Sequence, residues 1–347
     1  MATQLTAAEA QDNVQPNLLA LCSTMIALST LALCLRLWSN HITFAHRWGW
    51  DDFFAALALP FIIALNGVII WWIYLGLGKH AATAPAEDLA KVPKIIFVGA
   101  FLYDCSISLP KFSVLFFYRR IFETTSRWMT IALWTVGAMN AGWLVSALVS
   151  TIFQCSPVNA AWETVPGSIC IPQWDWFLGT ALPSMIIDLC ILIIPMPILL
   201  RLQAPLARRM KVGVLFLCGY SVIVISIGRL VSIAKAGPHL LDDINWTTIN
   251  YMEWLLCEGP ISLVSVCLPN VFRLFKRASQ DGVRGMLPDS RGGSKMVSSD
   301  TNASRKGQFI RMEDRPSHSP KQMEGTADAV PEEGQPEQDR QMVGTAV

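Results

Sequence analysis

Charged residues are scarce in this 347-residue sequence: Asp, Glu, Lys and Arg make up 15% of the chain, against roughly 25% in soluble domains. Hydrophobic residues make up 52%. The formal net charge is only +1, so the composition does not favour binding to nucleic acid. Little charge and a high hydrophobic content are typical of an integral membrane protein, whose first partner is the lipid bilayer.

Patterns of metal ligands are also missing. The nine Cys include no CxxC pair and no Cys/His spacing typical of zinc, and most of them lie in apolar runs. The five His all fall outside the apolar runs, which argues against a membrane di-iron enzyme with clustered His ligands. We therefore predict no metal site and no bound cofactor.

Seven apolar runs are long enough to cross about 30 Å of hydrocarbon as helices. They cover residues 18–35, 53–75, 95–118, 129–153, 176–200, 212–234 and 247–272. We predict an all-α membrane protein with a seven-transmembrane helix bundle formed by residues 18–277. Residues 1–17 are predicted to form a short extracellular N-terminus. Residues 278–347, rich in Ser, Gly, Pro, Gln and charge, are predicted to form a disordered cytoplasmic tail.

The distribution of Lys and Arg in the short loops predicts the orientation. The first, third and fifth loops are basic, with Arg119 and Arg120 in the third, and so is the segment after the last run. The N-terminus and the fourth loop have no basic residue, although the second loop is an exception with three Lys. This pattern predicts the N-terminus outside and the C-terminus in the cytoplasm. Cys155 and Cys170 share the outer fourth loop, where a disulfide can persist; two free thiols are the alternative.

Six charged residues fall inside the predicted spans, where a charge near the centre costs about 2.5 to 3.5 kcal/mol on insertion scales. They are Asp104, Lys111, Asp188, Arg229, Glu253 and Glu258. Their depths in the membrane predict two interhelical pairs, Lys111 with Asp188 and Arg229 with Glu253. Asp104 and Lys111 lie roughly 10 Å apart along one helix, too far to pair directly. These charges either fix helix packing or line a polar cavity, open to the outside, that binds a small molecule or relays protons.

Several motifs follow one another in the order found in a known family. They are WGWDD at 48–52, GLGKH at 76–80, KFSVLFFYRRIF at 111–122, FQCSP at 153–157 with Trp162, Asp188 with PMP at 195–197, Ser226 with Arg229, Glu258, and CLP at 267–269. With these motifs, roughly residues 30–277 resemble the fungal rhodopsin-domain family. That family holds many proposed fungal G-protein-coupled receptors (GPCRs) and membrane proteins of mycotoxin gene clusters. The resemblance implies a fungal source and a seven-helix membrane protein, and it names no ligand.

Retinal chemistry is excluded, because a Schiff base needs a Lys, normally on the seventh helix, and residues 247–272 contain none. Our first prediction is a GPCR-like receptor, in the plasma membrane or another endomembrane, that senses an extracellular or membrane-borne small molecule. A G-protein α-subunit is its candidate partner, although the sequence YRR at 118–120 lacks a preceding acidic residue. The alternatives are an intramembrane enzyme that uses Asp104, Asp188 and Glu258 as general acids, and a transporter serving a secondary-metabolite pathway.

Overall fold

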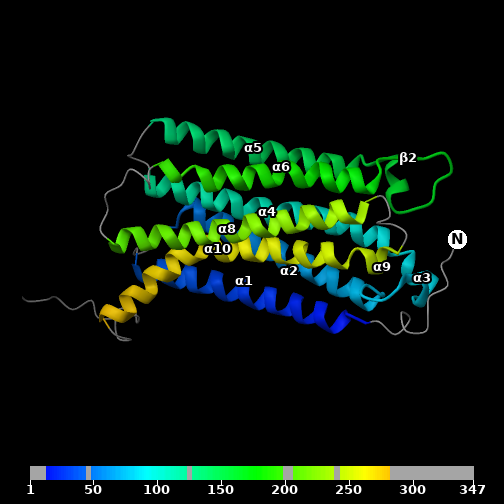
Figure 1. Cartoon of the computed structure of the whole chain (residues 1–347), viewed down its shortest axis with the longest axis horizontal. Coiled ribbons are helices and arrows are strands. Elements are labelled where there is room, and N and C mark those ends of the chain that lie inside the picture. Colours follow the sequence, from blue (N-terminus) through cyan, green and yellow to red (C-terminus); the bar gives the residue numbers. More distant parts are fainter. Residues whose placement is uncertain (1–12, 44–47, 123–126, 198–205, 238–242, 282–347) are drawn as a thin grey trace, which may run out of the picture. The chain divides into compact units, whose positions relative to one another are not determined.

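The computed structural model describes residues 13–43, 48–122, 127–197, 206–237 and 243–281. The long helices are α1 (Gln15–Thr43), α2 (Trp50–Tyr74), α4 (Val92–Phe122), α5 (Arg127–Ile152), α6 (Gln173–Ile193), α8 (Leu206–Ala236) and α10 (Ile249–Asp281). The short elements are η2 (Ala81–Thr83), α3 (Ala86–Leu89), β1 (Cys155–Ser156), η3 (Val158–Ala161), β2 (Ile169–Cys170) and α9 (Ile244–Thr247). In this described part of the chain, seven helices are long and apolar enough to cross a membrane. The predicted seven-helix bundle and multi-pass membrane protein are thereby confirmed (Figure 1).

Helix α6 ends at Ile193, before the end of the fifth predicted span, whose residues 198–200 lie outside the described part of the chain. Pro195 follows two residues after Ile193. A proline has no backbone N–H, so Pro195 cannot donate the next hydrogen bond of the helix. At the other extreme, α10 continues to Asp281, past the boundary predicted at residue 277. The rest of the predicted tail lies outside the described residues, as do residues 1–12 of the predicted N-terminus.

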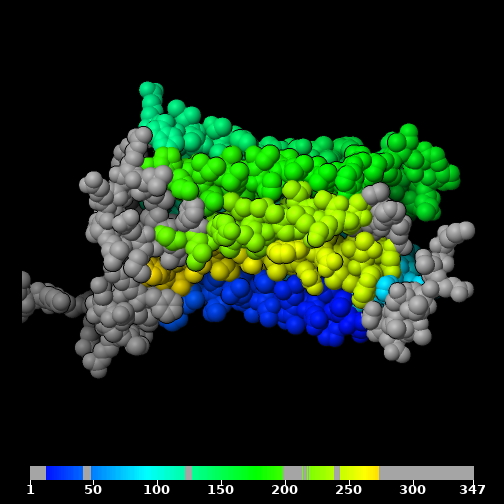
Figure 2. Space-filling model, in the orientation of Figure 1, coloured from blue at the N-terminus to red at the C-terminus, as the bar shows by residue number. Residues whose placement is uncertain are grey.

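Two helices form the centre of the bundle. Helix α4 contacts α2, α5, α6 and α10, and α10 contacts α1, α2, α4 and α8. In Figure 2, α6, α8, α10 and α1 form neighbouring bands on one face of the bundle. A charged side chain on α4 or α10 can therefore reach partners on several other helices without facing lipid.

One end of the bundle carries the loop between α5 and α6, and we call it the disulfide end (Figure 1). Strands β1 and β2 pair there in antiparallel register, with Cys155 opposite Cys170. Their sulfur atoms are bonded, and the two Cα atoms lie 4.1 Å apart. The predicted disulfide is therefore present, and the alternative of two free thiols is wrong.

The GLGKH motif, residues 76–80, begins the second loop at the same end of the bundle. Gly76 and Gly78 adopt φ values of 120° and 91°, which only glycine adopts without strain. The Gly78 N–H donates to the Asn245 carbonyl oxygen at 3.1 Å, and His80 Nδ1 lies 2.7 Å from Asp243 Oδ2. Asn245 is itself fully buried. These contacts tie the loop after α2 to α9 and the residue before it.

Candidate functional site

A buried ion pair lies between α8 and α10. The Arg229 Nε atom is 2.7 Å from Glu258 Oε2, and the two side chains are 2% and 1% exposed. The same Glu258 oxygen accepts a hydrogen bond from the Tyr103 hydroxyl of α4 at 2.6 Å. The guanidinium also lies over the Tyr103 ring, 5.4 Å from its centroid. Three helices are therefore joined at one carboxylate, and each charge has the partner that burial in an apolar medium requires.

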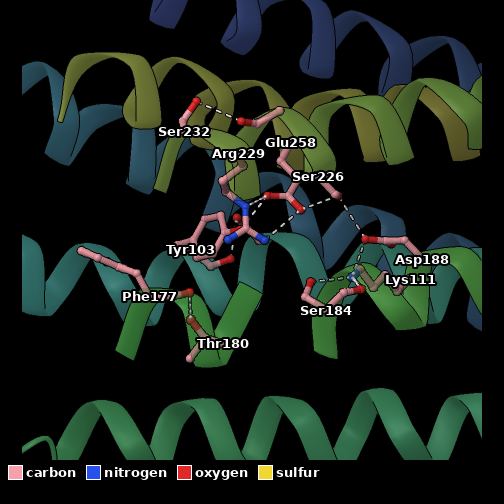
Figure 3. A network of polar contacts seen from close by, with 12 residues as sticks. Tyr103, Lys111, Phe177, Thr180, Ser184, Asp188, Ser226, Arg229, Ser232 and Glu258 are labelled. Carbon is pink, nitrogen blue, oxygen red and sulfur yellow. Dashed lines mark hydrogen bonds and ion pairs between the residues drawn. The ribbon is translucent and has the colours of Figure 1, made fainter. Parts of the chain in front are cut away.

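The polar contacts continue from Glu258 toward the other end of the bundle. The Ser226 hydroxyl of α8 is 2.9 Å from Glu258 Oε1 and 3.3 Å from Asp188 Oδ2 of α6. Its single hydrogen can satisfy one of these acceptors at a time. Asp188 Oδ2 accepts from Lys111 Nζ at 3.0 Å, and Lys111 also donates to the hydroxyl of Ser184 at 2.8 Å. Figure 3 shows the resulting polar chain, which we define as Tyr103, Arg229, Glu258, Ser226, Asp188, Lys111 and Ser184.

The structure brings Lys111 and Asp188 together as the sequence predicted. The other predicted pair, Arg229 with Glu253, is wrong, because Arg229 contacts Glu258 and Glu253 is exposed. Five residues of α-helix rotate a side chain by roughly 140°, so the two glutamates point in different directions from α10. Both glutamates lie at a membrane depth that would allow pairing with Arg229. Only Glu258 projects from α10 toward Arg229.

Asp104 has a different environment from the other buried charges. Asp104 is only 3% exposed. Its side-chain Oδ2 atom has no hydrogen-bond partner in the described part of the chain. It lines a cavity near the disulfide end, with an empty volume of about 490 Å³, which we call the Asp104 cavity. Trp176 lines the same cavity, and its indole Nε1–H is likewise buried without a partner among the described residues.

The walls of the Asp104 cavity are mostly aromatic and aliphatic. Trp72, Tyr103, Phe177 and Tyr251 contribute rings from α2, α4, α6 and α10. Burying an unpartnered acceptor and an unpartnered donor costs free energy. An occupant with an apolar body, one donating or cationic group and one acceptor would recover both hydrogen bonds, and aromatic faces also attract cations.

A second cavity lies beside the other end of the polar chain. Lys111 and Asp188 line it together with Tyr118 and Gly219, and its empty volume is about 500 Å³. We call it the Lys111 cavity. Tyr103 lines the first cavity and Lys111 the second, so the polar chain connects the two.

A second ionic cluster, opposite the disulfide end, was missed by the sequence analysis. Arg36 is fully buried, and its NH2 and Nε atoms lie 2.7 Å and 2.8 Å from carboxylate oxygens of Asp51 and Asp52. Its NH1 donates to the Val266 carbonyl oxygen of α10 at 2.6 Å. Arg120 joins the cluster at 3.3 Å from Asp51 Oδ1. The WGWDD motif thus joins α1, α2, α4 and α10.

Sequence signals for these missed residues were present but ambiguous. Arg36 and Arg120 each follow an apolar run, as residues that only mark orientation do. Ser226 appeared in the family motifs without a role, and Tyr103 resembles an ordinary aromatic core residue. A polar residue within an apolar run, at the same depth as a charge on another run, is the signal that could have identified Ser226 and Tyr103.

Arg119, predicted in the third loop, has a different environment from Arg120: its guanidinium lies 5.3 Å from the centroid of the Trp134 ring.

Comparison with known proteins agrees with this architecture. The chain is 25% identical over 284 residues to the polyenoic acids biosynthesis gene cluster protein Ba17b of Metarhizium anisopliae, a match covering 77% of this chain and 75% of that protein. It is 26% identical over 237 residues to the wortmanamides biosynthesis cluster protein C of Talaromyces wortmannii, covering 67% and 65%. It is 26% identical over 183 residues to a SAT4 family membrane protein of Emericella nidulans, covering 52% and 45%. No solved structure matches.

The family comparison covers the end of α1 and the other long helices, including the polar chain. The model of the fungal rhodopsin domain matches residues 35–277, which include both ionic clusters, the disulfide and the Asp104 cavity. The chain therefore belongs to the fungal rhodopsin domain family.

Proposed function

We propose that this protein is a receptor-like sensor that binds a small molecule in the Asp104 cavity and responds through the polar chain. One observation carries the proposal. Tyr103 lines the Asp104 cavity and also donates a 2.6 Å hydrogen bond to Glu258, at the start of the chain. A ligand that contacts Tyr103 or Asp104 would therefore change the surroundings of the first member of a network that reaches four helices.

The chemistry of the cavity supports ligand binding in particular. The walls are apolar, and two polar atoms, Oδ2 of Asp104 and the indole Nε1 of Trp176, are unpartnered among the described residues. A few convergent polar groups on apolar walls are what orient a ligand in such sites.

The polar chain supports a response as well as binding. A ligand shifts a conformational equilibrium only when it binds one state better than the other. Ser226 can donate to Glu258 or to Asp188, which gives the chain two hydrogen-bonded arrangements. The Lys111 cavity supplies space for α6 and α8 to adjust. We propose that ligand binding favours one arrangement over the other.

The relatives give the biological setting that we propose. Two of them are named for biosynthetic clusters, of polyenoic acids and of wortmanamides. We infer that this chain also serves a fungal secondary-metabolite pathway. It would do so at the plasma membrane, by sensing a small molecule that regulates the pathway. A G-protein α-subunit is the proposed partner on the cytoplasmic side, and ligand-dependent co-purification of that subunit is the direct check.

A producing strain provides the test. Deletion of the gene and the variant Asp104→Asn should both change transcription without accumulation of a pathway precursor. The amide keeps the size of Asp104 but removes its charge, so the variant protein should accumulate to the wild-type level. Glu253→Gln is the matched control, because this exposed residue touches neither the cavity nor the chain. A strain with normal amounts of the Asp104→Asn protein and an unchanged transcriptome would overturn the proposal.

An intramembrane enzyme is the second candidate, and the same cavity favours it. A buried carboxyl group without a partner can serve as a general acid, and aromatic faces can stabilise a developing positive charge on a substrate. In that case the deletion and Asp104→Asn strains would both accumulate the same precursor. The metabolite profile therefore separates the two candidates.

A further inference from the structure

A groove runs between α4 and α5 on the outside of the bundle, and neither the polar chain nor the Asp104 cavity includes it. Its empty volume is about 740 Å³. Its lining on α5 comes from Thr130, Trp134, Gly137, Ala138 and Ala141, among others, and Arg119 stands at its α4 side. The residues 130, 134, 137 and 141 follow the spacing of one helical face. We call this feature the α4–α5 groove.

The polar residues of the groove are confined to one end. Arg119 lies three residues before the end of α4, and Thr130 three residues after the start of α5. The floor beyond them is made of the small residues Gly137, Ala138 and Ala141. From Thr130 to Ala141 the helix rises roughly 17 Å, close to half of the ~30 Å hydrocarbon thickness. The groove therefore runs from one membrane interface to about the midplane, which is the path of one acyl chain.

The positive charge of Arg119 at the polar end favours lipids with an anionic head group. No lining residue of the groove is acidic. Arg119 is exposed, and the ion pairs of the described residues do not include it, whereas the neighbouring Arg120 contacts Asp51. The Arg119 guanidinium lies over the ring of the half-exposed Trp134, which orients it and leaves its N–H edge for an oxyanion. Guanidinium groups bind phosphate through two parallel hydrogen bonds.

We propose that the α4–α5 groove is a binding site for an anionic glycerophospholipid, with its phosphate on Arg119 and one acyl chain along Gly137 to Ala141. The site lies on the side predicted to be cytoplasmic, where anionic lipids are concentrated. A second copy of this chain could also cover an outward groove, but its apolar helix face would leave the Arg119 cation without a counterion. The binding of a lipid here is independent of the ligand proposed for the Asp104 cavity.

Two variants test the head-group contact and the acyl-chain contact separately. Arg119→Gln removes the cation and leaves the apolar groove. Gly137→Leu fills the groove: a Cβ at Gly137 would meet only Leu115 Cδ1 of α4, at the ordinary distance of 3.9 Å, so a Cβ fits on the helix between these two lining residues. Two controls match them, and both lie on α5. Arg127→Gln removes an exposed Arg outside the groove, and Gly142→Leu adds a side chain where nothing lies within 4 Å.

The experiment uses the full chain in nanodiscs of phosphatidylcholine alone or mixed with phosphatidylserine. The lipids that remain bound after extraction are counted by native mass spectrometry. Wild type should retain phosphatidylserine preferentially. Arg119→Gln should lower that preference about fivefold, the equivalent of the roughly 1 kcal/mol that one Arg near an anionic surface contributes. Gly137→Leu should lose both lipids, and the controls should behave as wild type.

Three outcomes would overturn the proposal. The preference for phosphatidylserine could survive Arg119→Gln, or lipid retention could survive Gly137→Leu in protein with a wild-type thermal midpoint. The protein could also run as a dimer that Gly137→Leu converts to a monomer, in which case the groove is an interface between copies. A variant that fails to fold is identified by its thermal midpoint, and Ala138→Leu then replaces Gly137→Leu as the groove-filling variant.

Discussion

Arg229 of α8 and Glu258 of α10 form an ion pair at 2.7 Å in the interior of the bundle. Glu258 also accepts from Tyr103 of α4 and from Ser226 of α8. This one carboxylate therefore neutralises the cation and satisfies two hydroxyl donors. Its position explains how an arginine is accommodated in an apolar span, where an isolated charge would be among the most costly groups to bury.

Glu258→Gln should strongly destabilise the bundle. The change leaves Arg229 buried without a counterion, and breaking a buried pair from one side costs about 3–5 kcal/mol. The thermal midpoint of the protein in detergent micelles, followed by intrinsic tryptophan fluorescence, should fall accordingly. The double variant Arg229→Gln/Glu258→Gln should recover part of this loss, because no uncompensated charge remains.

Glu253→Gln is the control for that prediction, since Glu253 lies on the same helix but is exposed. Its effect on the free energy of unfolding should stay within about 0.5 kcal/mol, as for surface substitutions in general. Equal destabilisation by Glu253→Gln and Glu258→Gln would contradict the assignment of the Arg229 partner.

Lys111 and Asp188 should be energetically coupled. Their atoms Nζ and Oδ2 lie 3.0 Å apart, and contacting residues typically show interaction energies of about 0.5–3 kcal/mol in double-mutant cycles. We expect Lys111→Met and Asp188→Asn each to lower the thermal midpoint, and the double variant to lose less than the sum of both. Strict additivity would mean that the two side chains contribute independently, with Ser184 as the principal partner of Lys111.

Arg36→Gln should reduce the amount of folded protein. Arg36 is fully buried and balances both Asp51 and Asp52, so its removal leaves two adjacent carboxylates with Arg120 as the cation that the described residues place beside them. A loss of about 3–5 kcal/mol is expected. The monodisperse peak in fluorescence-detected size-exclusion chromatography should shrink or vanish. Arg127→Gln, an exposed Arg at the start of α5, should leave that peak unchanged, and the same loss in both variants would argue against the cluster.

The orientation in the membrane can be tested with a glycosylation acceptor. Pro166→Asn creates an Asn-Gly-Ser acceptor in the turn between β1 and β2, at an exposed position. If the disulfide end is extracellular, this variant should gain a glycan that a glycosidase removes, and wild type should carry none. The acceptor at Asn245 should stay unused, because that side chain is buried and accepts a hydrogen bond from Trp72. A glycan on the acceptor at Asn302, near the C-terminus, would instead show the opposite orientation.

The spans and the disulfide could be predicted from the sequence because they depend on properties local to the chain. A run of some 20 apolar residues must form a helix in lipid, since every backbone N–H and C=O needs a partner there. Cys155 and Cys170 were predictable because they share one short loop between two spans. The Lys111–Asp188 pair was predictable because depth in the membrane is nearly proportional to residue number.

Direction around each helix was decided only by the tertiary structure. Arg229 had two glutamates at suitable depths, and the packing of α8 against α10 turned Glu258 toward it. Arg36 follows an apolar run like any interfacial arginine, but the close approach of α1, α2 and α10 encloses it completely. Asp104 had no partner assigned from the sequence, and in a cavity lined by rings from four helices one of its oxygens stays unpartnered among the described residues. Residue number along a helix therefore determines depth, whereas the partner of a buried charge depends on how tilted and kinked helices face one another.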